Sequence, residues 1–274
     1  MVPAHSGPSV RALIVALVVA IVGVLSLDAT AIVAAPDTAA ASQAALPLAQ
    51  APQTPRDQLR LIRWAGQEFL VSPRGSRGPN NDLMTDSTAA VHVDSRGRLH
   101  LKVTRYKGKW ASVELLGLNP MDYGTYTFKT TGRLARLARP YDLGMFVIRP
   151  DGSLDNEIDL ENSRALIGMH HGLNAQYVVQ PYYQPHHIFR YGIAQNARHT
   201  EQTFTWTKAD VKFSTKQNNS LRPFAHFHYH GPSAPTNYNV YLHINLFIHG
   251  PNHTHVGSGI RSVILDSLTY RPAH

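Results

Sequence analysis

The chain of 274 residues contains no cysteine. A disulfide framework, a metal site built from thiolates and a cysteine nucleophile are therefore all excluded. Charged residues are also few, at 16% of the chain, and tryptophan occurs three times. Because no covalent cross-link is available, the folded state must be stabilised by burial of apolar side chains.

Acidic residues are fewer than basic ones, with 18 Asp and Glu against 26 Lys and Arg, and the formal net charge is +8. The basic residues are scattered and form no block, so the sequence does not indicate a nucleic-acid partner. A basic surface would instead suit an anionic polysaccharide or an acidic cell-envelope surface.

Long apolar runs are absent except at 13–27. This run is shorter than the about 20 residues of a membrane span, and it is typical of a secretory signal. We therefore predict that residues 1–35 form a signal peptide, with an uncleaved membrane anchor as the alternative. Both interpretations place the bulk of the protein outside the cytoplasm, in the cell envelope or secreted.

Residues 36–55 are rich in Ala, Pro, Gln and Ser. Such a segment lacks the large apolar side chains that would offset the entropy of ordering, so we predict a disordered linker. The remaining residues, 56–274, are numerous enough for one large domain with its own core.

Residues 56–274 consist of short runs interrupted by Gly, Pro, Asn and Asp, and no long run has a helical apolar period. Such runs predict β-strands. The candidate strands are 89–94, 99–103, 110–116, 125–130, 143–148, 176–180, 204–206, 211–213, 240–245 and 262–265. Many short strands at this spacing predict an all-β sandwich of two antiparallel sheets.

One segment, Glu-Ile-Asp-Leu-Glu at 157–161, gathers three carboxylates. In a strand, Glu157, Asp159 and Glu161 share one face, and the two apolar residues between them pack on the other. Like charges on one face repel each other, so a sheet usually avoids them unless they have a use. Two interpretations remain open: a solvated edge strand, and a carboxylate cluster for acid-base or nucleophilic chemistry.

Six segments of the chain follow one another in a familiar order. They are GRLHL at 97–101, YGTYTF at 123–128, EIDLE at 157–161, TFTWT at 203–207, HINLF at 243–247 and LDSLTY at 265–270. Together they resemble glycoside hydrolase family 16, whose central strand reads Glu-Ile-Asp-Ile-Glu. The resemblance spans Trp64 to Tyr270. It implies a concanavalin A-like jelly roll and an enzyme that cleaves β-linked glucans or galactans with retention.

The resemblance also implies a role for each acid. Glu157 would be the nucleophile, Glu161 the acid/base, and Asp159 the group that orients and tunes them. The reaction requires one ionised carboxylate and one that holds a proton. Repulsion among three close acids raises at least one pKa and supplies that difference.

Four further residues are candidates for sugar binding, which needs aromatic faces and polar groups in a cleft. Glu114 and Asn245 fall where the resemblance implies substrate-binding residues, although a solvent-facing acid and a structural Asn are the alternatives. Trp206 could stack on a sugar, but an aromatic side chain in its segment also suits the core. Tyr182, next to Tyr183, could line a cleft.

Two positions depart from the family's pattern. Asp155 stands where many family glucanases have Trp, and Leu116 stands where they have Arg. The loss of a stacking surface and of a cation that binds hydroxyl groups leaves the catalytic strand intact. It puts the usual glucan specificity in question.

The chain has 16 histidines, and His226, His228 and His230 alternate along one candidate strand. Alternating imidazoles can hold a metal ion, and His253 and His255 could add ligands. The same pattern suits half-exposed polar positions, and no paired carboxylate accompanies it in the sequence. We therefore predict no metal site and no cofactor.

These observations predict a secreted retaining glycoside hydrolase, or transglycosylase, that cleaves O-glycosyl bonds of a β-linked polysaccharide by double displacement. The substrate would be a β-glucan or a galactan, anionic where the basic surface favours it. We expect a monomer without a nucleic-acid partner, and membrane association only if the N-terminal segment stays uncleaved. Two alternatives remain open: a carbohydrate-binding jelly roll without catalysis, and a His-rich metal-binding envelope protein.

Overall fold

The computed structural model describes residues 59–78, 81–150, 157–166, 168–236, 239–249 and 259–273. The predicted signal segment and linker lie outside these residues, as do Asp155, His253 and His255. Among the residues described, regular structure is almost entirely β, and the one helical segment is the 3-10 turn η3 (Leu134–Arg136). No helix in this part of the chain is long and apolar enough to cross a membrane.

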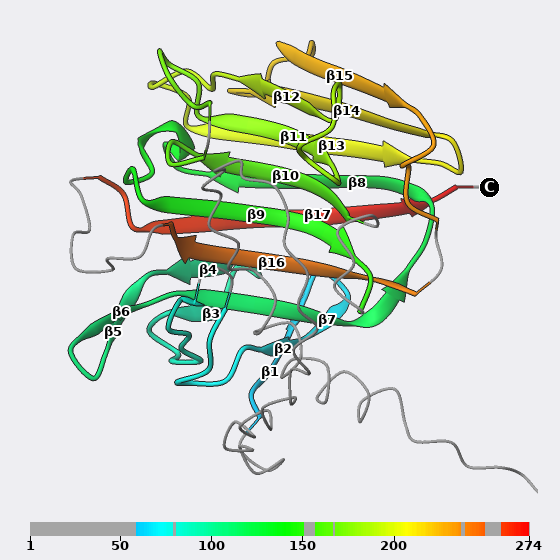
Figure 1. Ribbon diagram of the computed structural model, residues 1–274. Helices are drawn as coiled ribbons and strands as arrows, with labels where there is room; N and C mark the ends of the chain where they lie inside the picture. Colours follow the sequence, from blue (N-terminus) through cyan, green and yellow to red (C-terminus); the bar gives the residue numbers. More distant parts are fainter. Residues whose placement is uncertain are drawn as a thin grey trace, which may run out of the picture.

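Two antiparallel sheets pack face to face (Figure 1). The larger sheet has the spatial order β1 (Leu61–Trp64), β2 (Gln67–Val71), β7 (Val113–Met121), β16 (Val240–Ile248), β9 (Tyr141–Ile148), β10 (Glu157–Ser163), β11 (Ala175–Val179), β12 (Ile188–Tyr191). The smaller sheet has the order β15 (Ala225–His230), β14 (Asp210–Gln217), β13 (His199–Trp206), β8 (Gly124–Thr131), β17 (Ser262–Pro272), β4 (Leu99–Lys102), β3 (Val91–Val93). A separate hairpin joins β5 (Thr104–Tyr106) and β6 (Lys109–Ala111). The predicted all-β sandwich is confirmed.

The core lies between the two sheets and follows from the alternation of side chains along the strands. In β8 and β13 every second residue is buried, because successive side chains of a strand point to opposite faces. Tyr126 and Phe204 stack there with ring centroids 4.5 Å apart. From the larger sheet, Ile158 and Leu160 of β10 enter the same core and are fully buried.

A buried polar network also lies between the sheets and joins β10 to its neighbours. Asn162 Nδ2 donates a hydrogen bond to Gln202 Oε1 at 3.1 Å, and Gln202 Nε2 donates to the Tyr191 hydroxyl at 2.7 Å. The hydroxyl groups of Tyr191 and Tyr177 both contact Thr215 Oγ1, at 2.8 and 2.5 Å. Because unsatisfied polar groups are costly inside a core, this network favours a single register for β10.

Candidate active site

The acidic strand β10 lies inside the larger sheet and not at its edge. It pairs with β9 on one side and with β11 on the other (Figure 1). The interpretation as a solvated edge strand is therefore wrong. Since Ile158 and Leu160 point into the core, the side chains of Glu157, Asp159 and Glu161 lie on the outer face of the sheet.

The register of the sheet sets a row of side chains across this outer face at the level of Glu161. Directly opposed residues of an antiparallel pair share one face, so the row can be followed from strand to strand. It runs through Glu114 on β7, Asn245 on β16, Gly144 on β9, Glu161 on β10 and Gln176 on β11. The structure thus brings the predicted acid/base and two predicted substrate-binding residues into one line.

A second row crosses the same face at the level of Asp159. It contains Leu116 on β7, His243 on β16, Phe146 on β9, Asp159 on β10 and Val178 on β11. Leu116, which replaces the family's usual Arg, is therefore opposed by an imidazole. His243 Nδ1 also lies 3.7 Å from Glu114 Oε1. An imidazole therefore lies close to Leu116, the position at which the family's usual Arg is missing.

Glu157 and Asp159 form a pair joined by a side-chain hydrogen bond. Burial raises the pKa of Glu157, while the hydrogen bond from Asp159 and the nearby His243 act in the opposite direction. Asp159 is 2% exposed, and burial together with the charges of Glu157 and Glu161 raises its pKa well above the usual range. Asp159 therefore holds the proton of the pair and donates it in a hydrogen bond to Glu157.

Gln180 binds the carboxyl group of Asp159. Its Nε2 donates to Asp159 Oδ2 at 3.2 Å, while its Oε1 accepts a hydrogen bond from the backbone N–H of Tyr182 at 2.8 Å. Its own backbone N–H donates to the Glu157 carbonyl at 3.1 Å. The turn after β11 is thus attached to the acidic strand through two atoms of Gln180, its side-chain Nε2 and its backbone nitrogen.

Glu161 has a different environment. Burial, together with the negative charge of Asp142, raises its pKa to about 8. Gln176 Nε2 donates a hydrogen bond to Glu161 Oε2 at 2.5 Å, which stabilises the ionised form and opposes the rise. At neutral pH the carboxyl group of Glu161 is therefore mostly protonated.

The two predicted substrate-binding residues of the Glu161 row are both held by neighbours. Ser72 Oγ donates to Glu114 Oε2 at 3.2 Å. Asn245 Oδ1 accepts the backbone N–H of Gly144 at 3.1 Å, so this side of the amide has a structural role. A Cβ at Gly144 would approach Asn245 Oδ1 to 2.7 Å, which explains why a residue without a side chain stands between Asn245 and Glu161.

The two predicted aromatic contacts have different outcomes. Tyr182 is 49% exposed and, through its hydrogen bond to Gln180, lies beside the acidic strand, where it can meet a ligand. The prediction that Trp206 stacks on a sugar is wrong, since Trp206 belongs to the smaller sheet and is fully buried. Its Nε1 donates to the Pro235 carbonyl at 2.8 Å, and its ring packs edge-on against Tyr123.

Sequence reasoning missed Gln176, Gln180, Asp142 and His243 as members of the site. The two glutamines flank a valine at alternate positions and so share one face of a strand, which was a usable signal. Asp142 and His243 gave no such signal, because their proximity to the acidic residues depends on the order of strands β16, β9 and β10.

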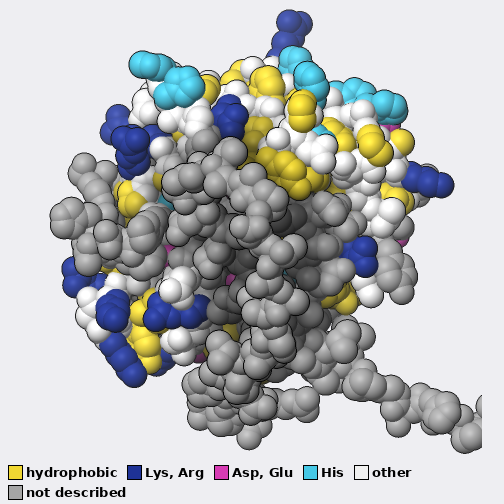
Figure 2. Space-filling view, in the orientation of Figure 1, with side chains coloured by type: hydrophobic (Ala, Val, Ile, Leu, Met, Phe, Trp, Pro, Cys, Tyr) yellow, Lys and Arg dark blue, Asp and Glu magenta, His cyan; other side chains and the backbone are white. Residues whose placement is uncertain are grey.

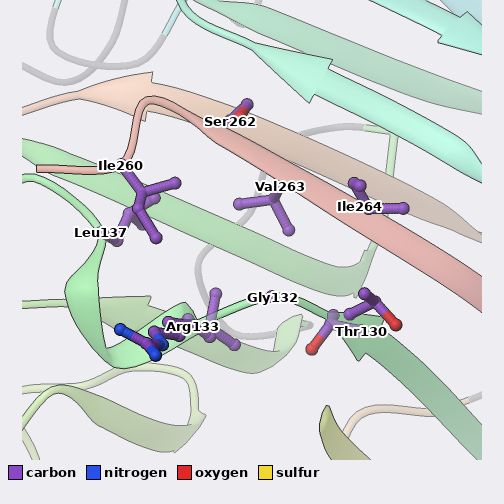
Figure 3. Close-up of a pocket in the computed structure, with 10 residues that line it drawn as sticks. Thr130, Gly132, Arg133, Leu137, Ile260, Ser262, Val263 and Ile264 are labelled. Atoms are coloured by element: carbon purple, nitrogen blue, oxygen red, sulfur yellow. The ribbon is translucent and has the colours of Figure 1, made fainter. Parts of the chain in front are cut away.

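The pocket shown in Figure 3 does not belong to this site. It has a volume of about 150 Å³ and lies where β8 ends and β17 begins, with Leu137 and Ile260 close together at one side. The residues around it are Thr130, Thr131, Gly132, Arg133, Leu134, Leu137, Ile260, Ser262, Val263 and Ile264. No Asp or Glu lines it, so it has no part in the acid chemistry considered for β10.

The arrangement on β10 can divide proton transfer and nucleophilic attack between two groups. Glu161 holds a proton that it can give to a leaving oxygen, and Glu157 is the carboxylate that receives a hydrogen bond from Asp159. The charges of Glu157 and Glu161 influence each other, so the two groups act within one electrostatic site. This division is what a double-displacement reaction at a glycosidic bond requires.

Neither a protein-family model nor a curated protein sequence matches the chain. Solved structures do match. A Mycobacterium tuberculosis protein described as an immunostimulatory antigen and pseudo β-1,3-glucanase has TM-score 0.56 and 18% identity over 75% of this chain and 91% of its own. The Bacillus licheniformis β-glucanase has TM-score 0.54 and 14% identity, with 81% and 95% covered.

A third structure is a prokaryotic β-1,3-1,4-glucanase, or lichenase, from a mouse hindgut metagenome. It has TM-score 0.53 and 13% identity, with 80% of this chain and 96% of its own covered. At such identities the likeness concerns the fold, and it agrees with the resemblance to glycoside hydrolase family 16 found in the sequence. The chain therefore has the jelly-roll sandwich fold of these β-glucanases, with its three-carboxylate strand inside the larger sheet.

Proposed function

We propose that the protein is a retaining glycoside hydrolase that cleaves O-glycosyl bonds of a β-linked polysaccharide. The observation that carries the proposal is the placement of Glu157, Asp159 and Glu161 on one face of β10, inside the sheet, with different hydrogen-bond partners. Glu161 keeps a proton at neutral pH, whereas Glu157 accepts a hydrogen bond that stabilises its anion. A solvated acidic strand would need no such difference.

In the first step Glu161 protonates the glycosidic oxygen as Glu157 attacks the anomeric carbon. The C–O bond to the leaving sugar breaks, and a covalent glycosyl ester forms on Glu157. In the second step the Glu161 carboxylate removes a proton from water, which attacks the same carbon and releases Glu157. Two inversions give net retention, and replacement of water by a second sugar gives transglycosylation.

Asp159 and Gln180 act as positioning residues in this scheme. The hydrogen bond from Asp159 holds the Glu157 carboxylate and stabilises its negative charge before attack. Gln180 fixes the orientation of Asp159 through its amide. Removal of either side chain should slow both the formation and the hydrolysis of the covalent ester, because Glu157 carries negative charge before it attacks and again as it leaves.

For the substrate we propose a β-glucan or a related galactan. The solved structures with this fold include two described as β-glucanases, which supports the class of polymer. The exposed ring of Tyr182 offers a stacking surface beside β10. His243, opposite Leu116 and close to Glu114, can supply a hydrogen-bonding group where the family's usual Arg is missing. The formal charge of +8 also suits an anionic polymer.

The site of action that we propose is the cell exterior or envelope, on the basis of the apolar run 13–27. Expression of the full chain with a reporter fused to its C-terminus, followed by fractionation, tests this directly. Enzyme activity of the reporter in the cytoplasmic fraction alone would refute an extracytoplasmic location. We propose that the released protein acts as a monomer, which size-exclusion chromatography with light scattering measures.

Purified full chain incubated with β-glucans, agar and carrageenan tests the catalytic proposal. Reducing sugar should appear with at least one polymer and should be lost in Glu157→Gln and Glu161→Gln. Glu201→Gln, an acid of β13 in the opposite sheet that pairs with Lys216 at 3.1 Å, is the matched control and should keep activity. Equal sugar release from wild type and both active-site variants would refute the proposal.

One observation favours a second candidate, a carbohydrate-binding protein without turnover. The M. tuberculosis structure with this fold is described as a pseudo β-1,3-glucanase. Affinity electrophoresis in the same polymers separates the two cases. Retardation of wild type, together with the absence of reducing sugar over long incubation, would support binding alone.

A further inference from the structure

Three side chains at the edge of the smaller sheet point their ligand atoms at one spot. His228 Nε2 lies 2.6 Å from Asp210 Oδ1, and His230 Nδ1 lies 2.7 Å from the same oxygen. One ligand atom from each of the three residues lies within 4.8 Å of the other two. Exposed histidines, in cyan, gather in Figure 2 along the edge of the molecule where Figure 1 places β12 and β15.

The strand register explains this convergence. His228 and His230 are separated by one residue of β15, so both project from the same face, and Tyr229 between them is buried. Asp210 of β14 is the cross-strand partner of His230. Two imidazoles from one strand and a carboxylate from the next are thus brought to one face of the sheet by the strand register.

The ligand types match those of a first-row transition metal. Imidazole nitrogen and carboxylate oxygen bind Zn²⁺ at about 2.0 to 2.2 Å, in a tetrahedral arrangement that three protein ligands and a water can complete. Tetrahedral ligands at that length lie roughly 3.3 Å apart. The nitrogen-to-oxygen distances need to lengthen by only about 0.6 Å to reach this value. His228 and His230 are exposed, so their rings can make this adjustment.

We propose that Asp210, His228 and His230 form a binding site for a divalent transition-metal ion of the Zn²⁺ type, with solvent as the remaining ligand. The site joins β14 to β15, which is the outermost strand of the smaller sheet. A bound ion would therefore hold this edge strand in place. The site lies on a different sheet from β10, and the proposal does not depend on glycosidase activity.

The contacts within the cluster support this assignment, because His228 and His230 both direct a ring nitrogen at Asp210 Oδ1. The neighbouring positive charge is Lys212, the cross-strand partner of His228. A bound metal ion would take the place of the protons between these atoms, and both nitrogens and Asp210 Oδ1 would then be directed at the ion.

A second His and Asp pair elsewhere lacks this arrangement. His100 Nε2 lies 2.9 Å from Asp94 Oδ2, but Arg98 binds the same oxygen and two backbone N–H groups bind the other. No second imidazole reaches Asp94 among the hydrogen bonds of the described residues. His100 is therefore a control for a histidine that is paired with a carboxylate but does not belong to a metal triangle, although it is half-buried.

Asp210 was not anticipated as a ligand, because it lies 18 residues before His228 and only the pairing of β14 with β15 brings the two together. The proposal thus departs from the absence of a metal site predicted from sequence. The proposed site also differs from the three alternating histidines of the sequence. His226 of the same strand is opposed by Ser214 and is not part of the triangle.

The test uses the full chain without an affinity tag, freed of metal by a chelator and titrated with Zn²⁺ by calorimetry. Wild type and His100→Ala should both bind one ion tightly at this site. Asp210→Asn and the double variant His228→Ala, His230→Ala should each weaken that binding by roughly tenfold or more. X-ray absorption of the loaded wild type should show nitrogen and oxygen ligands at about 2.0 to 2.2 Å.

Thermal unfolding supplies an independent readout. Zn²⁺ should raise the Tm of wild type and of His100→Ala, because an ion that binds only the folded state stabilises it. The rise should be absent in Asp210→Asn, whose isosteric side chain keeps the fold. Equal affinity and equal Tm shifts in wild type and Asp210→Asn, or no binding by wild type, would overturn the proposal.

Discussion

The pKa of Glu161 offers a sharp prediction, because two neighbours act on it in opposite directions. Burial and the charge of Asp142 raise this pKa, the hydrogen bond from Gln176 lowers it, and the net value is about 8. Activity requires the protonated form of Glu161, so kcat/KM should fall as pH rises through about 8. Asp142→Asn should move this alkaline limb to lower pH, and Gln176→Leu should move it to higher pH.

The register of the sheet sets the size of the first effect. Asp142 lies two residues before Gly144, the cross-strand partner of Glu161, so it is a diagonal neighbour at about 7 Å. Two unit charges at that distance and an effective dielectric constant of about 20 interact by roughly 2 kcal/mol. Since about 1.4 kcal/mol corresponds to one pH unit, the limb should move by about one to two pH units. Loss of the Gln176 hydrogen bond should move it by about one pH unit the other way.

The assay is a pH profile of kcat/KM on the most active polymer of the panel, measured between pH 4 and 10 for each variant. Glu201→Gln, an acid on the opposite sheet, should leave the limb where it is in wild type. A limb that stays fixed in both Asp142→Asn and Gln176→Leu, or that moves to higher pH in Asp142→Asn, would refute the assignment of Glu161 as the general acid.

Three further predictions concern the catalytic strand, its neighbour and the core. Glu157→Ala should abolish turnover, and added azide should restore part of it as a glycosyl azide of inverted configuration, seen by NMR; a retained azide product would contradict a nucleophilic role. Gly144→Ala should lower stability by about 1 to 3 kcal/mol in urea unfolding and weaken substrate binding, because its Cβ would lie 2.7 Å from Asn245 Oδ1. Trp206→Ala should lower the free energy of unfolding by about 3 to 5 kcal/mol, because the side chain is fully buried. KM should be unchanged at a temperature where the variant is folded, and a raised KM would instead indicate that Trp206 contacts the substrate.

The fold was accessible from the sequence because alternation is a local property. The predicted strands 125–130 and 143–148 correspond to β8 and β9, and the hairpin of β3 and β4 was recognised from its turn and flanking strands. Strands β1, β2 and β12 were missed. Each is only four or five residues long, too short for periodicity to distinguish a strand from a loop.

The site was only partly accessible, because its chemistry depends on which strands are neighbours. The three acids of β10 were recognisable from their spacing alone. Their partners Gln176 and Asp142 come from β11 and β9, and the sequence does not state that these strands flank β10. Trp206 illustrates a second limit of the sequence. The motif around it predicts a strand, but it does not indicate which sheet that strand joins or on which face Trp206 lies.

The anomeric configuration of the first product released from a β-linked polymer tests the central claim most directly. NMR spectra recorded in the first minutes of hydrolysis, before mutarotation, distinguish the two anomers. If Glu157 attacks and Glu161 supplies and removes the proton, the β-anomer should appear first. Release of the α-anomer first, or release of β-product that persists in Glu157→Ala without any added nucleophile, would contradict it.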